Sequence, residues 1–177
     1  MSPRSRSVST ALGVLLLFAL PLLPEILGTR LLIFRDAQLT HWPWRRVAMA
    51  ALESGRVPLL NEAASGTQPL LANPNAVLLY PTVLLERVFS PAAAFNLHYL
   101  LHVLWAFLGA RRLASRLGVT PPAALFAGAA YAFSGMVLSY GSAFFNSGAA
   151  AAWLPWCAAA ALGVTRATTL SGAARAA

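Results

Sequence analysis

The chain has 177 residues, of which 58% are hydrophobic and 10% are charged, and its mean hydropathy is +0.65. A water-soluble domain carries about 25% charged residues, so this composition excludes an ordinary soluble protein and indicates a membrane protein. The formal net charge is +8, and all 13 basic residues are arginines. Because several of them flank apolar runs, the charge indicates membrane orientation and not nucleic-acid binding.

Four apolar runs are each long enough to cross the hydrocarbon core as a helix, which takes about 20 residues. The alternation typical of a membrane β-barrel is not visible in the sequence. The sequence therefore predicts one all-α membrane domain over residues 1–177. The predicted transmembrane spans are 11–28, 92–110, 123–140 and 149–164. A large outer loop is predicted at 30–90.

The N-terminal segment MSPRSRSVSTALGVLLLFALPLLPEILG has the basic start and apolar centre of a secretory signal peptide. No small-x-small cleavage site follows directly, and the apolar pattern continues past Arg30. We therefore expect a retained helix at 11–28, with kinks at Pro21 and Pro24 and its N-terminus in the cytoplasm.

The predicted outer loop contains THWPWRRVAMAALESG, whose apolar residues recur at helical spacing up to Gly55. Trp42 and Trp44 suit the headgroup layer, so we expect a short interfacial helix here. From Val57 onward, prolines and Gly66 interrupt every periodicity, which predicts an ordered loop or a series of helix breaks. The loop also carries six arginines, but long loops cross membranes with little regard to charge.

The later spans follow a simple arginine pattern. Arg111, Arg112 and Arg116 close the second span at a short connection containing LGVTPP, and Arg166 follows the fourth span. Arginines at short connections mark the cytoplasmic side, so both termini of this multi-pass protein are predicted to be cytoplasmic.

The third span is rich in Gly, Ala and Ser, which let neighbouring helix backbones approach closely. We expect helix contacts at Gly128 and Gly135, and a short outer turn at GSAFFNSG. Cys157 is the one cysteine, which excludes an intrachain disulfide.

Asp36 is the first candidate for chemistry, because it lies just past the first predicted span. At that depth a carboxylate can reach a lipid-linked substrate, as a general base or as a ligand of a divalent cation, the one cofactor that the sequence leaves open. The alternative is an interfacial acid that pairs with Arg35 or Arg30 and caps the next helix, and on spacing alone this structural interpretation is favoured. Glu53 and Glu62 are interpreted as solvated loop acids.

Other polar residues of the loop can contact a substrate. Arg45 and Arg46 have the donor geometry to clamp a phosphate or pyrophosphate, and contact with anionic lipid headgroups explains them equally well. Asn73 and Asn75, in LANPNAVLLYP, can bond a sugar hydroxyl or hold the turns of the loop.

His98 and His102 are four residues apart and share one helix face, as two metal ligands would. The sequence offers no obvious third ligand, and polar groups inside a membrane usually bond across helices, so no metal site is predicted. Glu86 is set aside with its neighbour Arg87. No nucleophile elbow, phosphate-binding glycine loop or Ser/His/Asp set is present in the sequence.

The order of several short motifs resembles a known family. F-x-D follows the first span, and G-x-x-P-L-x-N, G-x-x-P-L-x-A-N-P and Y-P come next in the loop. The second half carries N-L-H-Y-L-L-H, R-R-L-A-S-R-L-G-V, Y-A-F-S-G and W-L-P-W. From about Leu31 to Leu162, this order resembles the YfhO-like bacterial membrane proteins, relatives of the GT-C glycosyltransferases.

The resemblance implies an enzyme of the bacterial cytoplasmic membrane that moves a sugar from a polyprenyl-phosphate carrier to a cell-envelope acceptor on the outer side. In such folds an acid in the first outer loop is associated with the active site, and the matching residue here is Asp36. The resemblance then assigns His41, Arg45 and Arg46 to the donor-phosphate region.

Members of that family are several times longer and have many more spans. This chain has Ser65-Gly66 where members often have two glycines, and it has no acid after Glu86. We therefore expect the N-terminal part of a GT-C-like fold, which a second chain could complete. The alternatives are a non-catalytic membrane scaffold or assembly subunit, an inactive fragment and, third, a transporter.

Overall fold

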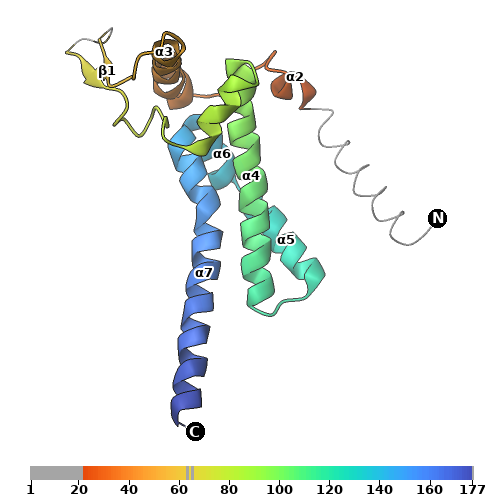
Figure 1. Ribbon diagram of the computed structural model, residues 1–177. Helices are drawn as coiled ribbons and strands as arrows, with labels where there is room; N and C mark the ends of the chain where they lie inside the picture. Colours follow the sequence, from red (N-terminus) through yellow and green to blue (C-terminus); the bar gives the residue numbers. More distant parts are fainter. Residues whose placement is uncertain (1–21, 63, 65, 177) are drawn as a thin grey trace.

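The structure of the protein is a computed structural model that describes residues 22–62, 64 and 66–176 (Figure 1). Most of the regular structure in this part is helical, and one short antiparallel hairpin joins two strands of two residues each. The elements in chain order are α2 (Leu23–Ile26), η1 (Ala37–His41), α3 (Trp42–Glu53), β1 (Leu60–Asn61), β2 (Gln68–Pro69), η2 (Pro81–Arg87), α4 (Pro91–Arg116), α5 (Pro121–Ala132), α6 (Gly135–Ala143) and α7 (Phe145–Ala176).

Among the described residues, three helical segments are long and apolar enough to cross a membrane, and each contains one of the later predicted spans. They are Pro91–Arg116, Pro121–Ala143 and Phe145–Arg166. The expectation of a helical membrane protein is confirmed at this level. The first predicted span, 11–28, lies mostly outside the described residues; the structure describes residues 22–28 of it, which contain α2.

Local sequence sets where α4 begins and ends. The Ser90 side chain accepts a hydrogen bond from the Ala93 N–H (3.3 Å), and Pro91 occupies the first helical position, where its missing N–H has no cost. Helix α4 ends at Arg116, and Gly118, two residues further on, has φ +88°. Only glycine adopts this left-handed conformation without steric penalty, so the stop predicted from LGVTPP is confirmed.

The second candidate span is broken in the middle, although the sequence predicts one continuous helix at 123–140. Phe133 and Ser134 separate α5 from α6, and the Ser134 side chain accepts from the Val137 N–H (3.3 Å) as a helix cap. A serine cap in an apolar run restarts the helix in a new direction. The predicted outer turn is also mostly helical, since Phe144 alone separates α6 from α7.

Small residues allow α4 to pack against α5 and α7. A buried cluster joins these helices and α6: Ala106, Ala132, Val137 and Ala152. A Cβ atom at Gly128 would lie 2.9 Å from the Phe107 carbonyl oxygen, so glycine is required at this contact. The expected contact at Gly135 is wrong: this residue begins α6 and a Cβ atom there would meet open space.

Helix α7 contains Pro155, which lacks the N–H that would bond the Ala151 carbonyl four residues earlier. The Tyr131 hydroxyl on α5 donates a hydrogen bond to this carbonyl at 2.8 Å. Because hydrocarbon offers no water, a carbonyl freed by proline must find a partner in a neighbouring helix. Tyr131 therefore satisfies the carbonyl that Pro155 leaves without a donor, and it joins α5 to α7.

Residues 30–62 and 66–90, which we call the polar cap, fold over one end of the helices (Figure 1). The helix predicted within the loop is confirmed as α3, and Gly55 just beyond it has φ +73°, as expected for a helix stop. A buried cluster packs α3 against the rest of the cap: Ala48, Leu70, Ala76 and Leu78. The position of α3 at a membrane interface stays a prediction.

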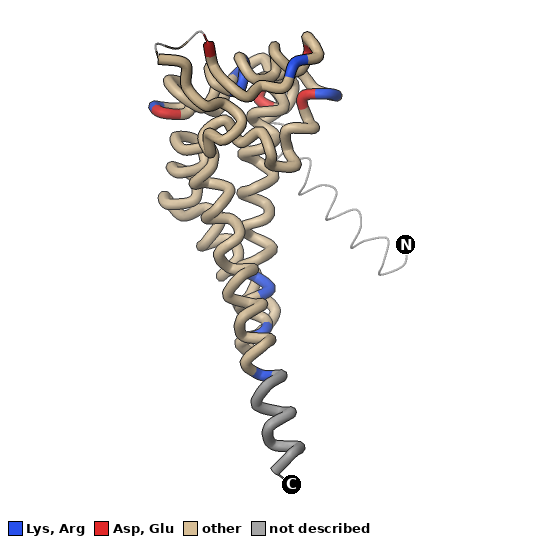
Figure 2. Tube along the Cα trace, turned by 60° about the vertical axis from the view of Figure 1, so that its left-hand side comes forward, with Lys and Arg blue, Asp and Glu red and all other residues tan. Residues whose placement is uncertain are grey.

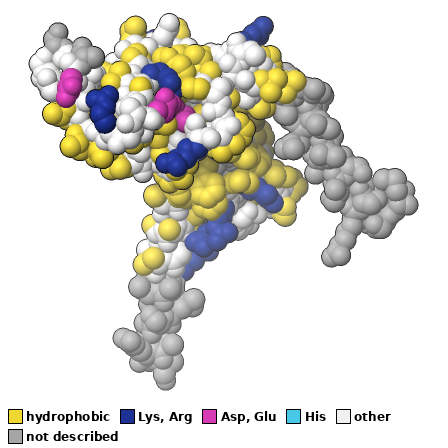
Figure 3. All heavy atoms as spheres, turned by 45° about the horizontal axis from the view of Figure 1, so that its top comes forward, with side chains coloured by type: hydrophobic (Ala, Val, Ile, Leu, Met, Phe, Trp, Pro, Cys, Tyr) yellow, Lys and Arg dark blue, Asp and Glu magenta, His cyan; other side chains and the backbone are white. Residues whose placement is uncertain are grey.

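Charge is distributed unevenly between the two ends of the molecule. All five acids lie at the end that carries the cap, interspersed with arginines (Figure 2). The opposite end, which we call the arginine end, carries Arg111, Arg112, Arg116 and Arg166. Figure 3 shows an apolar belt between the two groups of charged side chains. This separation is the pattern of a helical bundle with an asymmetric membrane orientation.

Candidate functional site

The backbone around Asp36 is unusual on both sides. Arg35, directly before it, has φ +52°, which is uncommon for any residue except glycine. Directly after it, η1 is a π-helical turn, a form that is rare and frequent at functional sites. Strained backbone of this kind persists where the surroundings hold it, and it clusters at active sites.

Hydrogen bonds to α6 and within the segment itself hold it in place. The Phe34 N–H donates to the Ser142 carbonyl at the end of α6 (2.9 Å), and the Thr40 hydroxyl donates to the Asp36 carbonyl (2.5 Å). The segment that carries Asp36 is therefore fixed to the end of the second candidate span.

The Asp36 side chain is half-buried, and no described residue donates a hydrogen bond to its carboxylate or forms an ion pair with it. It does not cap the following helix, and the described arginines Arg30 and Arg35 do not pair with it. The alternative interpretation of Asp36, as an acid that pairs with an arginine and caps the next helix, thus lacks the contacts that it requires. The carboxylate is left available for another partner.

His41 is the last residue of η1 and is buried. Its Nδ1 lies 2.7 Å from the Asn75 carbonyl oxygen. A carbonyl can only accept, so Nδ1 carries the hydrogen and Nε2 of the neutral ring has the free lone pair. Burial lowers the pKa of His41 below its usual 6.5, against smaller opposing effects from the Asn75 carbonyl and the Asp36 charge. His41 is therefore a neutral imidazole within electrostatic reach of Asp36 at pH 7.

Asn75 links His41 to the last candidate span. The Asn146 side-chain amide, in the first turn of α7, donates to the Asn75 side-chain oxygen at 3.1 Å. The Asn75 N–H in turn donates to the Asn73 side chain at 2.9 Å. Asn73 thus holds a loop turn, as its structural interpretation predicts, and Asn75 joins the loop to α7.

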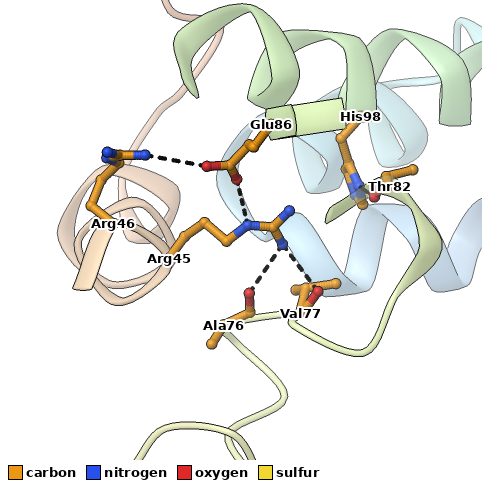
Figure 4. A network of polar contacts seen from close by, with 7 residues as sticks. All are labelled: Arg45, Arg46, Ala76, Val77, Thr82, Glu86 and His98. Carbon is orange, nitrogen blue, oxygen red and sulfur yellow. Dashed lines mark hydrogen bonds and ion pairs between the residues drawn. The ribbon is translucent and has the colours of Figure 1, made fainter. Parts of the chain in front are cut away.

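Arg45 and Arg46 belong to a separate group centred on Glu86 (Figure 4). Arg45 Nε lies 2.6 Å from Glu86 Oε1, and both side chains are 4% exposed. Arg46 Nη1 lies 3.2 Å from Glu86 Oε2, and its side chain is 33% exposed. No sequence pattern singles out Glu86, yet it is the centre of this group. Its partners are 40 and 41 residues away in the chain, so only the fold of the polar cap brings them together.

Arg45 also fixes a strained turn of the loop. Its Nη1 donates to the Ala76 and Val77 carbonyls, at 3.2 and 3.0 Å (Figure 4). Val77 has φ +52°, a conformation that a β-branched residue adopts only under strain. The buried arginine therefore stabilises the turn that presents Asn75 to His41. Of the two arginines, Arg46 alone is exposed enough to meet a phosphate.

His98 and His102 take part in a polar network. It joins Tyr80 and the adjacent η2 to α4 and α7. The Thr82 hydroxyl lies 2.6 Å from His98 Nδ1, and His98 Nε2 lies 3.3 Å from the Phe145 carbonyl. His102 Nδ1 lies 2.6 Å from the His98 carbonyl. Since each carbonyl must accept, His98 carries its hydrogen on Nε2 and His102 carries it on Nδ1.

The second half of this network involves aromatic residues. Tyr80 donates its hydroxyl hydrogen to His102 Nε2 (2.8 Å) and accepts from Trp153 Nε1 (2.7 Å). Every polar atom thus named has a partner, as a buried network requires. Within the described residues, no group of three or more His, Cys, Asp or Glu side chains could hold a metal ion. The two histidines therefore act as a structural junction.

The candidate functional site thus consists of Asp36, His41, Asn75 and Asn146, at the cap end of the candidate spans. Sequence patterns identify the first three, but the link to Asn146 depends on the fold, and its position in the predicted outer turn is the one signal for it. No protein-family model, curated protein or solved structure matches this chain.

Proposed function

We propose that this chain contributes the acid-bearing outer loop of a membrane glycosyltransferase, which moves a sugar from a polyprenyl-phosphate carrier to a cell-envelope acceptor. The observation that carries the proposal is Asp36, a half-buried carboxylate with no hydrogen-bond or ion-pair partner among the described residues. A left-handed residue precedes it and a π-helical turn follows it. Such a backbone is expected where a group is held for chemistry.

Asp36 acts as a general base in the proposed reaction. It takes the proton of the acceptor hydroxyl as that oxygen bonds to the anomeric carbon of the sugar. The bond from this carbon to the carrier phosphate breaks, and the polyprenyl phosphate leaves with the electron pair. Arg46, the partly exposed arginine of the Glu86 group, contacts the phosphate, while Arg45 supports the loop.

The orientation proposed for the protein follows from the arginine end. Three arginines, Arg111, Arg112 and Arg116, lie beside the short connection between α4 and α5, and Arg166 ends the third candidate span. Arginines in short connections are retained in the cytoplasm. The polar cap and Asp36 then face outward in the bacterial cytoplasmic membrane.

A non-catalytic scaffold is the second candidate, and a specific observation favours it. The polar cap uses Arg45, Glu86 and Asn75 for contacts that hold the cap together and join it to α7. In this alternative Asp36 has no chemical role, and the Asp36→Asn substitution does not change sugar transfer to the cell envelope.

The two candidates are separated by a transfer assay in membranes that contain the protein. Polyprenyl phosphates that carry radiolabelled glucose, galactose or mannose serve as donors, and labelled cell-envelope material is the product. Asp36→Asn is compared with Glu62→Gln, which neutralises an exposed acid of the same cap, at matched protein abundance. The proposal expects loss of transfer in the first variant only. Equal transfer in both variants would refute a catalytic Asp36, and no transfer by the unaltered protein from any donor would favour the scaffold.

A further inference from the structure

An apolar groove opens at the opposite end of the molecule from Asp36. It has a volume of about 480 Å³ and is lined by residues of α4, α5, α6 and α7. Its walls include small side chains on two of these helices, namely Ala110 and Ala114 on α4 and Ala158 on α7. The small side chains leave room between helices that are otherwise in contact.

Polar atoms contribute very little to the surface of this groove. Because Pro155 has no N–H, the Ala151 carbonyl lacks its usual helical donor, but the Tyr131 hydroxyl donates a hydrogen bond to it at 2.8 Å. Both Pro155 and Tyr131 line the groove. With this carbonyl satisfied, the groove presents carbon atoms at the depth of the membrane and is suited to a hydrocarbon chain.

The arginines near the groove divide into two kinds. Arg116 donates to the Ala159 carbonyl on α7, and Arg166 donates to the Arg116 carbonyl on α4 at 2.7 Å. Both therefore lock the helices together. In the described part of the chain, the exposed side chains of Arg111 and Arg112 form no such bond.

Of the two arginines without such a bond, Arg111 lies closer to the groove lining on α4. It lies three residues before Ala114, and residues three apart are neighbours on a helix surface. Arg112, one residue further on, has Ser115 and Arg116 as its corresponding neighbours, and neither lines the groove. Among the described residues, the Arg111 guanidinium is therefore the uncommitted positive charge that can complement the groove.

We propose that the groove and Arg111 bind a membrane phospholipid with an anionic headgroup. One acyl chain occupies the apolar groove, and the headgroup phosphate accepts hydrogen bonds from the Arg111 guanidinium. Basic residues at pockets between membrane helices on the cytoplasmic side bind anionic headgroups in this way. The site lies at the arginine end, so it is independent of the function proposed for Asp36.

The test measures lipid binding to the purified full-length protein in mild detergent. Phosphatidylglycerol and phosphatidylcholine with identical acyl chains are titrated, and bound lipid is counted by native mass spectrometry. We expect tighter binding of phosphatidylglycerol and a loss of about fivefold in affinity for Arg111→Gln, as one arginine near a lipid surface contributes. Arg112→Gln removes the same charge one residue away and should leave the affinity unchanged.

The groove itself is tested by filling it. Ala158→Phe places a large side chain in the groove and should abolish the preference, whereas Ala160→Phe alters an exposed residue of α7 that does not line it. Equal binding of the two lipids, or equal effects of the two arginine variants, would overturn the proposal. Competition by glycerol phosphate alone would also overturn it, because that result identifies a phosphate site without a role for the acyl chain.

Discussion

Glu86 is the residue whose removal should destabilise the polar cap most. Its oxygens lie 2.6 Å from Arg45 Nε and 3.2 Å from Arg46 Nη1. Glu86→Ala leaves the Arg45 guanidinium, 4% exposed, without its counterion. Removing one partner of a buried ion pair costs about 3–5 kcal/mol. Because Arg45 keeps its bonds to the Ala76 and Val77 carbonyls, we expect a loss near the lower limit, about 3 kcal/mol in the free energy of unfolding.

Urea unfolding in mild detergent, followed by tryptophan fluorescence, measures this loss, and Trp42 and Trp44 in α3 report on the cap. Arg87→Ala is the control, because this exposed neighbour has no ion pair among the described residues, and its effect should stay within about 0.5 kcal/mol. The double variant Arg45→Met/Glu86→Gln removes both charges and should recover more than half of the loss. A cost below about 1 kcal/mol for Glu86→Ala, the range of an exposed pair, would refute the reasoning.

Three further predictions concern the helices and the buried histidine of the cap. Tyr131→Phe removes the donor to the Ala151 carbonyl and should lower the free energy of unfolding by about 1–3 kcal/mol; an unchanged value would mean that another group satisfies this carbonyl. Gly128→Ala should cost about 1–3 kcal/mol by forcing α5 away from α4, whereas Gly135→Ala, in open space, should have no such cost in the same titration. Because burial lowers the pKa of His41, the unfolded chain binds more protons below pH 6.5, so stability should be level above that pH and fall below it. Urea titrations at several pH values test this, and a His41→Gln variant with the same acid sensitivity would contradict it.

The parts of the fold that depend on local sequence could be predicted. Apolar runs bounded by proline and glycine indicate the three candidate spans, and the helical spacing that ends at Gly55 indicates α3. The break at Ser134 could not be predicted, because a single serine in an apolar run is common inside membrane helices and its capping role depends on the direction of α6.

The candidate site was only partly predictable for a similar reason. Its position after the first span singles out Asp36, but neither the π-helical turn nor the left-handed conformation before it has a local sequence signal. The pairing of Arg45 with Glu86 spans 41 residues, and a sequence offers Glu86 a nearer partner in Arg87. Which arginine pairs with Glu86 therefore depends on how the outer loop packs, and the order of residues in the sequence does not reveal it.

Asp36 is proposed to serve chemistry and not stability. The most direct test measures two quantities on one Asp36→Asn preparation, the rate of sugar transfer from a polyprenyl-phosphate donor and the free energy of unfolding. The account predicts a fall in the rate of about 10²-fold or more, as for the loss of a general base, with stability changed by less than about 0.5 kcal/mol. An unchanged rate, or a rate that falls only together with stability, would contradict it.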